Sequence, residues 1–330
     1  MNIRPFFPRI AAGACAAACF WTAPALAQGS YPQKPIRVVI PFTPGGSADL
    51  SGRTVARKLS ERLGQPVVVE NIGGAGGEIG VNAVAQAPAD GYTILITPNG
   101  PITTAGRFKK LSYDPLKDLQ PVGVVTLLPL FVAVNAQFPA RNLAEFIDYA
   151  KKHPGVVNYG NPGPGSASHL NGELLSYAAG IKLVAVPYKG NGPAAAAVAS
   201  GETQAGFGDF PSFAPFGASG SGRVRLLAAF NETRTAVAPD VPTVSEAGLP
   251  AFKPIVSWIG MFLPAKTPAA ITNRLAQELD HVVRDPEVAA TLARVGGEPA
   301  SMSPERFGGY IRDQIRMLDQ LIADAGIRID

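Results

Sequence analysis

Two glycine-containing stretches of the chain carry groups that could bind a small anion. The first, Pro41-Phe42-Thr43-Pro44-Gly45-Gly46-Ser47-Ala48-Asp49, lies between an apolar run and a helical pattern. Its glycines allow a positive φ and a close approach to a ligand, and Ser47 or Asp49 can cap the helix. The first N–H groups of that helix lack intrahelical acceptors and lie at the positive end of its dipole. The stretch therefore predicts a site for a carboxylate or phosphate that needs no lysine or arginine.

The second stretch repeats this arrangement. Gly160-Asn161-Pro162-Gly163-Pro164-Gly165-Ser166-Ala167-Ser168-His169 follows a strand-like run, 156–159, and leads into a predicted helix, 170–179. Two helix N-termini that face one another across a cleft would hold a small anion from both sides, where open α/β sheets bind their ligands. The alternative is that each stretch is only a turn and cap between a strand and a helix.

Other chemistries have less support in the sequence. Ser166, His169 and an acid such as Asp49 or Asp209 could form a catalytic triad, which would make the protein an exported α/β hydrolase. The chain has no G-x-S-x-G motif, and its three histidines show no metal-ligand spacing, so we expect neither a triad nor a metal site. The run 74–80 lacks the Lys-Ser/Thr of a P-loop and the last glycine of a dinucleotide motif, so we expect no cofactor.

Short apolar runs alternate with helical patterns from Tyr31 onward, and these elements must position the two stretches. Helical faces predict a helix opened by Ser303-Pro304 over 307–322 and others near 52–63, 143–150 and 271–282. This alternation predicts an α/β fold with parallel sheets and helices on both faces. Buried strands are predicted at 36–40, 67–69, 92–96, 122–127, 130–134, 183–186 and 225–229.

The first 27 residues are predicted to be a secretory signal peptide. Arg4 and Arg9 precede an alanine-rich apolar run, and Ala25-Leu26-Ala27 has the form of a signal-peptidase site. A retained transmembrane helix is disfavoured because the run contains Pro24 and falls short of the ~20 strongly apolar residues that a span needs. We expect cleavage after Ala27 and export of the mature chain.

Composition narrows the class of protein. The formal net charge is +4, and Lys and Arg are dispersed, so we expect no nucleic-acid binding. Both cysteines, Cys15 and Cys19, lie within the predicted signal peptide, and alanine rather than a leucine-like residue stands three positions before each, which leaves lipidation as a minor alternative. The mature chain of about 300 residues must rely on its core instead of disulfides, and it can form one large or two ordinary domains.

Eight motifs, which include the two glycine stretches, follow one another along nearly the whole mature chain. Together they resemble the Bug-type substrate-binding receptors of the tripartite tricarboxylate transporter family, a group of periplasmic solute-binding proteins. The motifs are Pro41 to Asp49; Val69-Glu70-Asn71 with Gly74-Ala75-Gly76-Gly77 and Ile79-Gly80; Ala89-Asp90-Gly91-Tyr92-Thr93; Tyr113-Asp114-Pro115 with Asp118 and Pro121; Tyr159-Gly160 with Gly165-Ser166 and His169-Leu170; Val186-Pro187-Tyr188-Lys189-Gly190; Val241-Pro242-Thr243 with Glu246-Ala247-Gly248; and Trp258 with Gly260.

The resemblance implies a type II periplasmic binding protein fold. Each of its two α/β domains would be a mainly parallel sheet flanked by helices, and two crossings of the chain would join them. Domain 1 would comprise 28–127 and 260–330, and domain 2 would comprise 128–259. Hinge motion is expected at crossings near 125–130 and 254–262.

The resemblance also implies a function and a site. The protein would not be an enzyme; as a monomer it would bind a carboxylate, amino acid or aromatic acid between its domains and present this small-molecule ligand to membrane transporter subunits. A ligand sensor for a signalling partner is an alternative. Carried over residue by residue, the ligand-binding positions are Phe42, Gly46, Ser47, Ala48, Asp49, Gly165, Ser166, Ala167, His169 and Asp209.

Some positions depart from the family pattern, so the sequence does not decide the identity of the ligand. Ile72-Gly73 replaces the usual Arg-Pro or Lys-Pro, the second stretch is richer in proline, and Gln204 stands where an acid is common. Two large aromatic residues could pack in the interdomain region or stack on a ligand: we expect packing for Trp258, and both alternatives stay open for Tyr188.

Overall fold

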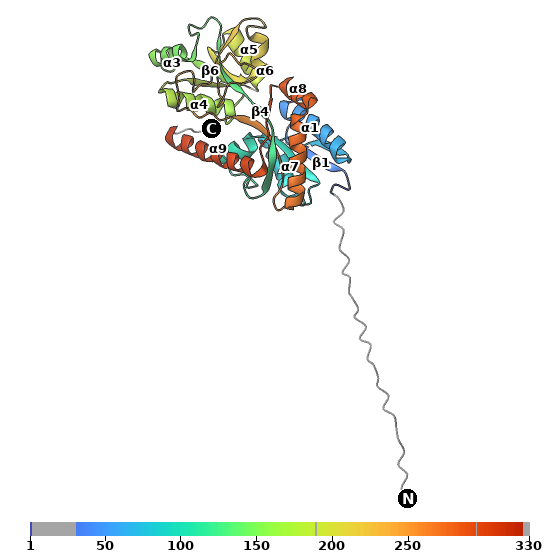
Figure 1. Ribbon diagram of the computed structural model, residues 1–330. Coiled ribbons are helices and arrows are strands. Elements are labelled where there is room, and N and C mark those ends of the chain that lie inside the picture. The colour runs from blue at the N-terminus through green and yellow to red at the C-terminus, as the bar shows by residue number, and fades with distance from the viewer. Residues whose placement is uncertain (2–30, 189, 295, 326–330) are drawn as a thin grey trace.

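The computed structural model describes Met1 and residues 31–188, 190–294 and 296–325, so the predicted signal peptide lies, apart from Met1, outside the described residues. The described chain forms two β-sheets, one above the other in Figure 1, and each is flanked by helices. None of the described helices is long and apolar enough to cross a bilayer.

The first sheet has six strands in the order β11-β4-β10-β3-β1-β2. β1 pairs in parallel with β2 and β3, whereas β10 runs antiparallel between β3 and β4. The strands are β1 (Ile36–Ile40), β2 (Val67–Asn71), β3 (Thr93–Pro98), β4 (Leu119–Leu128), β10 (Ser257–Pro264) and β11 (Glu298–Pro299). The accompanying α-helices are α1 (Ser47–Leu63), α2 (Glu78–Ala85), α7 (Ala269–Arg284), α8 (Pro286–Arg294) and α9 (Pro304–Ala325).

The second sheet has five strands in the order β7-β6-β8-β5-β9. β6 pairs in parallel with β7 and β8, whereas β5 runs antiparallel between β8 and β9. The strands are β5 (Leu130–Asn135), β6 (Asn158–Asn161), β7 (Val184–Pro187), β8 (Ala205–Asp209) and β9 (Val224–Ala229). The accompanying α-helices are α3 (Leu143–Lys152), α4 (Ala167–Ala179), α5 (Asn191–Ser200) and α6 (Phe210–Phe213).

The two sheets share one plan, in which a reversed strand pairs with the last of the parallel strands: β10 pairs with β3 in the first sheet, and β5 pairs with β8 in the second. The reversed strand is the one that arrives from the other sheet: Pro129 alone separates β4 from β5, and the segment 230–256 leads back to β10. In the first sheet the two-residue β11 is also reversed, because it runs antiparallel to β4. The expectation of two mainly parallel sheets is therefore confirmed, and β5 and β10 are antiparallel to their neighbours because a strand entering from the opposite sheet comes in with the opposite sense.

Both crossings at which hinge motion is expected include strand residues: 125–128 end β4, and 257–262 are most of the central strand β10, which the sequence did not predict as a strand. Gly260 interrupts the apolar pattern there for a packing reason: a Cβ on Gly260 would lie 2.5 Å from the ring of Phe307. The strand β8 was missed as well, because two of its five residues are glycines.

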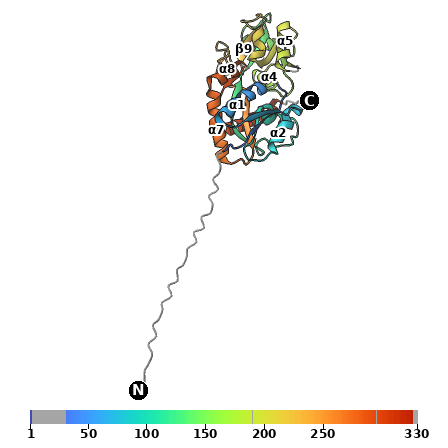
Figure 2. The same cartoon turned by 90° about the vertical axis from the view of Figure 1, so that its right-hand side faces the viewer.

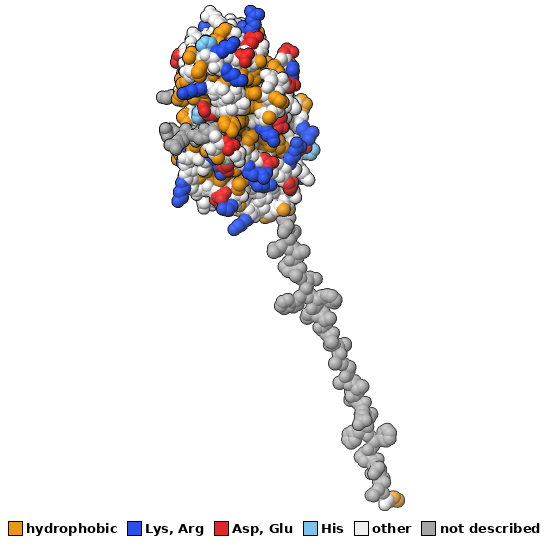
Figure 3. Space-filling model, turned by 90° about the vertical axis from the view of Figure 1, so that its left-hand side faces the viewer, with side chains coloured by type: hydrophobic (Ala, Val, Ile, Leu, Met, Phe, Trp, Pro, Cys, Tyr) orange, Lys and Arg blue, Asp and Glu red, His pale blue; other side chains and the backbone are white. Residues whose placement is uncertain are grey.

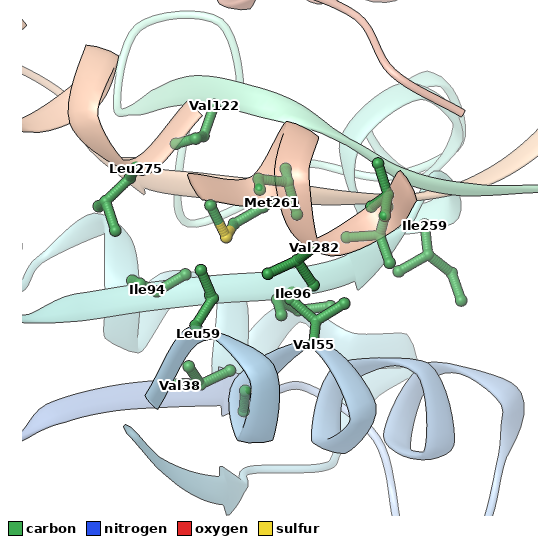
Figure 4. Close-up of a cluster of buried hydrophobic side chains, with 14 of the residues drawn as sticks. Val38, Val55, Leu59, Ile94, Ile96, Val122, Ile259, Met261, Leu275 and Val282 are labelled. Atoms are coloured by element: carbon green, nitrogen blue, oxygen red, sulfur yellow. The ribbon is translucent and has the colours of Figure 1, made fainter. Parts of the chain in front are cut away.

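The first sheet buries one apolar cluster on each face. Figure 4 shows Val38, Ile94, Ile96 and Met261 of the strands packed against side chains of α1 and α7. On the other face Trp258 is fully buried, with its ring edge-to-face against Phe307 at 5.0 Å and its Nε1 donating to Gln314 Oε1 at 2.8 Å. Trp258 is thus confirmed as a packing residue.

Two helices approach their sheets through a glycine, which fixes where each helix begins. In α1, a Cβ on Gly52 would lie 2.5 Å from Ile40 of β1, and in α4 a Cβ on Gly172 would lie 2.6 Å from the ring of Tyr159 of β6. A larger side chain at Gly172 would meet the ring of Tyr159, whereas one at Gly52 would force the end of the Ile40 side chain to move. Both helices are therefore held close to the strand that precedes them, so the loops between strand and helix are short and defined.

Candidate functional site

The two glycine loops line one cavity between the sheets. The cavity has a volume of about 680 Å³; Phe42 and Ser47 contribute from the first loop, and residues 162–168 contribute from the second. In Figure 2, α4 of the upper layer lies above α1 of the lower layer, and these are the helices that the two loops open. Residues far apart in sequence thus come together as expected for a pair of facing helix N-termini.

The first loop leaves the N-terminus of α1 uncapped. The N-cap residue is Gly46, and within the described part of the chain no side chain accepts a hydrogen bond from the first turn. The expectation that Ser47 or Asp49 caps the helix is wrong, because α1 begins at Ser47 and Asp49 lies inside its first turn. The free N–H groups of this turn, together with the helix dipole, favour an anion at this point of the cavity.

The Asp49 carboxylate holds the first loop in shape. It is 3% exposed, and it accepts hydrogen bonds from the Gly45 N–H at 2.9 Å, from Arg53 Nε at 2.9 Å and from Asn71 Nδ2 at 2.9 Å. Burial alone would raise the pKa of Asp49, but these hydrogen bonds outweigh it and keep the pKa below its usual value. Gly45 has a φ of 93°, which only glycine adopts without strain.

The second loop is closed in a similar way but is capped. Ser166 is the N-cap of α4: its Oγ accepts from the His169 N–H at 3.2 Å and donates to the Gly163 carbonyl at 2.8 Å. The Gly165 N–H donates to His169 Nδ1 at 3.2 Å, and Gly165 has a φ of 74°. The Ser166 hydroxyl is therefore engaged within its own loop.

His169 is a partly buried, neutral acceptor in this arrangement. Burial lowers the pKa of its imidazole, and the Glu173 carboxylate, whose Oε1 lies 3.8 Å from His169 Nε2, opposes this only in part. Glu173 in turn accepts from the Tyr159 hydroxyl at 2.8 Å. Because Nδ1 takes the Gly165 N–H and the Ser166 hydroxyl donates elsewhere, the pair lacks the serine–histidine hydrogen bond of a hydrolase.

The two loops correspond position by position at a constant spacing along the sequence. Each has a proline followed by a glycine with positive φ, and each glycine N–H donates to the side chain four residues later. The aligned pairs are Pro44 with Pro164, Gly45 with Gly165, Gly46 with Ser166, Asp49 with His169, Gly52 with Gly172 and Arg53 with Glu173. The cavity is thus bounded by two versions of the same structural unit.

No lysine or arginine among the described residues that line the cavity is free of an ion pair. Among the described residues that line it, Lys109 carries the only positive charge, and its ammonium is paired with Glu78. Asp209 caps α6 by accepting from the Ser212 N–H at 3.1 Å, and it also accepts from Asn191 Nδ2 at 2.5 Å. Attraction for an anion must therefore come from uncharged donors, such as backbone N–H groups, and from the helix dipoles.

The ten predicted site residues divide into two groups. Those that line the cavity are Phe42, Ser47, Gly165, Ser166, Ala167 and Asp209. Gly46, Ala48, Asp49 and His169 stand just behind the lining, and the last two hold the loops. The sequence did not point to Asn99, Asn191 or Ser257, which also line the cavity, because each follows or opens an element without any motif.

Other residues singled out in the sequence have structural partners. The Tyr188 hydroxyl donates to Glu202 at 2.7 Å, and burial together with this acid raises the pKa of Tyr188 to about 12. Gln204 Oε1 accepts from the Asn158 N–H at 3.0 Å. In the glycine run 74–80, Ala75, Gly76 and Glu78 line the cavity, and α2 begins at Glu78.

A separate hollow of about 590 Å³ lies between α9 and the segment 231–254. Its acids and bases are balanced, and Asp313 and Arg316 pair with one another. Neither glycine loop lines it. Figure 3 likewise shows acidic and basic side chains interspersed over one face of the molecule. The cavity between the two loops is therefore the better candidate for a ligand site.

Comparison with known proteins identifies a matching family and several similar solved structures. Residues 52–327 match the family described as "Tripartite tricarboxylate transporter family receptor". The periplasmic binding protein BugD is 32% identical, with a TM-score of 0.73 over 90% of this chain and 99% of that one.

Two further solved structures contain ligands. The R. palustris protein Rpa4515, solved with adipate, is 32% identical, with a TM-score of 0.77 over 90% of this chain and 99% of that one. MatC from Rhodopseudomonas palustris, solved with bound malate, is 30% identical, with a TM-score of 0.72 over 88% of this chain and 100% of that one.

Proposed function

We propose that this chain, which belongs to the tripartite tricarboxylate transporter receptor family, binds a small dicarboxylate in the cavity between its two sheets. Members of the family are periplasmic solute-binding proteins, and the chain is such a receptor and not an enzyme. One observation carries the proposed ligand class: the uncapped N-terminus of α1 opens into the same cavity as the N-terminus of α4.

The choice of a dicarboxylate has two supports. Two proteins that are 30% and 32% identical to this chain were solved with malate and adipate, which are both diacids. The cavity itself offers N–H donors from two opposed helix ends and no unpaired cation among its described lining residues. Backbone donors bind a carboxylate without the desolvation of a lysine or arginine. Where the carboxylate does not reach an N–H group directly, a water molecule can bridge the two.

We assign roles to the ten predicted residues on this basis. One ligand carboxylate accepts from N–H groups of the first turn of α1, at Ser47, Ala48 and Asp49, with Gly46 as the cap that leaves them free. Phe42 covers the apolar part of the ligand. Gly165, Ser166 and Ala167 present the start of α4 from the other side.

Three acidic or basic side chains complete this assignment. Asp49 and His169 are positioning residues, because each holds a loop through a glycine N–H. Asp209, a carboxylate without a cationic partner in the lining, faces a hydroxyl or amino group of the ligand when one is present.

We also propose the division into domains and the partners. Domain 1 comprises 28–127 and 260–330 and domain 2 comprises 128–259, with the second boundary better drawn at Ser257, where β10 begins. The ligand contacts both loops and so favours a closed form, which a hinge at Pro129 and at the segment before β10 permits. The mature protein begins at Gln28, is a monomer and delivers its ligand to membrane transporter subunits.

Thermal unfolding of ligand-stripped protein tests the ligand class. The screen contains mono-, di- and tricarboxylates, amino acids and aromatic acids. A ligand at ~100 times its dissociation constant should stabilise the protein by roughly 2.7 kcal/mol, which raises the melting temperature by several degrees. We expect this shift for C4 to C6 diacids. A shift confined to amino acids or aromatic monoacids would replace the dicarboxylate by that class.

A double variant tests the site independently of the ligand class. Ser47→Trp with Ser166→Trp places a large ring at each loop and should abolish binding while the circular dichroism spectrum of the folded protein is retained. Unchanged affinity in this variant would show that the ligand binds elsewhere.

A further inference from the structure

The side chain of Asn99 is buried at the cavity with an unused donor. Asn99 follows β3 directly, lines the cavity between the loops and is 4% exposed. Its Nδ2 is buried and has no hydrogen-bond partner among the residues that the structure describes. A buried amide without an acceptor is costly, so such a group calls for a partner that the protein alone does not supply.

The rest of Asn99 is fixed on all sides. Its N–H donates to the Trp258 carbonyl at 3.0 Å, and its carbonyl accepts from the N–H groups of Ile102 at 2.9 Å and Thr103 at 2.8 Å. Its Oδ1 accepts from the Ser257 hydroxyl at 3.4 Å, which orients the amide. The backbone of Asn99 is therefore held in place, and Nδ2 cannot gain an acceptor by a change of the backbone.

We propose that Asn99 Nδ2 donates a hydrogen bond to a second carboxylate of the bound ligand. This inference rests on the proposed function and deepens it by naming a residue that distinguishes a diacid from a monoacid. The first carboxylate lies at the N-terminus of α1, after β1. β3 is the parallel neighbour of β1, about one strand spacing (~4.8 Å) away where the two pair, so Asn99, which directly follows β3, stands at the same end of the sheet as the first loop. A diacid can reach both points, whereas a monoacid leaves Nδ2 without a partner.

Calorimetric titration of ligand-stripped protein tests this assignment. The probes are adipate and succinate, each with its monoamide, and the proteins are wild type, Asn99→Ala, Asn99→Asp and Asn231→Ala. Asn231 is the matched control, because it is 7% exposed and has a buried side-chain oxygen without a partner in the described chain, yet it lies at the other hollow.

We expect Asn99→Ala to weaken binding of the preferred diacid ~10- to 100-fold, as for loss of a hydrogen bond to a charged group. Asn99→Asp should reduce the preference for the diacid over its monoamide by more than ~10-fold, because the new carboxylate repels a carboxylate and accepts from an amide. Asn231→Ala should change neither the affinity nor the preference. A purely structural Asn99 would alter stability without altering the preference.

Three outcomes would overturn the inference. An Asn99→Ala affinity within twofold of wild type refutes the contact and leaves the proposed function intact. An Asn99→Asp variant that loses diacid and monoamide equally assigns Asn99 a structural role. Wild-type protein that binds neither diacid overturns the proposed ligand class and, with it, the second carboxylate at Asn99.

Discussion

The two loops at the cavity have the same geometry but opposite electrostatics. In the first, a glycine N–H donates to an acid, Asp49, which is paired with the base Arg53; in the second, the equivalent N–H donates to a base, His169, next to the acid Glu173. The first helix has no cap, whereas Ser166 caps the second. We infer that the first loop is the principal anion site and that the second completes the enclosure of the ligand.

This comparison explains why both loops can be stable without a ligand. A charged acceptor with three hydrogen bonds stabilises the first loop, so that loop can leave its first-turn N–H groups free for the ligand. In the second loop the acceptor, His169, is neutral, and Ser166 accepts from a first-turn N–H group of α4, that of His169. Variants at corresponding positions should therefore have unequal effects.

Removal of the charge at Asp49 should have the largest effect. Asp49→Asn places an amide N–H₂ against the donors of Arg53 or Asn71, so we expect a loss of about 2–3 kcal/mol in the free energy of unfolding and at least ~10-fold in ligand affinity. Urea unfolding and calorimetry measure the two effects. Glu61→Gln is the control, because Glu61 is an exposed acid on the same helix that pairs with Arg57, and it should change stability by less than ~0.5 kcal/mol. Equal effects of the two variants would contradict the role of Asp49.

Loss of the imidazole at His169 should have a smaller effect on the second loop. His169→Ala removes one neutral acceptor, so we expect about 1–2 kcal/mol lower stability and a several-fold weaker affinity. His169→Gln offers an amide oxygen to the Gly165 N–H and should recover part of both. The exposed His281 is the control, and His281→Gln should match wild type. Should His169→Ala cost as much as Asp49→Asn, the proposed ranking of the two loops is wrong.

The pH dependence should separate the two loops further. The pKa of His169 is lowered by burial, so between pH 7.5 and pH 5.5 the unfolded chain takes up a proton on this residue before the folded protein does. Stability therefore falls as the pH falls through the unfolded-state pKa of about 6.5, and the protonated ring can no longer accept from Gly165.

The Asp49 contribution should not change in this range. Its folded-state pKa lies below the usual value, so its stabilisation is lost only below about pH 4. We expect ligand affinity measured by calorimetry to decline from pH 7.5 to 5.5 in wild type and to decline less in His169→Gln. An identical decline in both proteins would assign the effect to another group.

Much of this architecture follows from local sequence signals. Glycine turns, apolar strands and helical faces predicted both loops and most elements, since each depends on residues within one segment. The reversed strand β10 did not follow, because its place between β3 and β4 depends on partners far away in the sequence. Asn99 could not be found from a motif, because its significance lies in an unused donor that only packing reveals. For Asp49 the sequence left a cap or a ligand contact open, and the structure instead shows a bond back to Gly45.

The smallest expected effect comes from an exchange of the two caps. Gly46→Ser would give α1 the cap that Ser166 gives α4, and a serine in place of glycine at an N-cap stabilises a helix by a few tenths of a kcal/mol. The new hydroxyl would accept from a first-turn N–H group that we assign to the ligand. We therefore expect unfolding in urea to shift slightly upward while ligand affinity falls several-fold.

The reciprocal change, Ser166→Gly, tests the same idea from the other loop. It removes the hydrogen bond from the His169 N–H and should cost a few tenths of a kcal/mol in stability. Because the freed N–H group then becomes available to the ligand, affinity should fall less than in Gly46→Ser. Opposite changes of stability and affinity at the first loop would mean that α1 is left uncapped for the ligand. Parallel changes at both loops would mean that the missing cap at Gly46 has no part in anion binding.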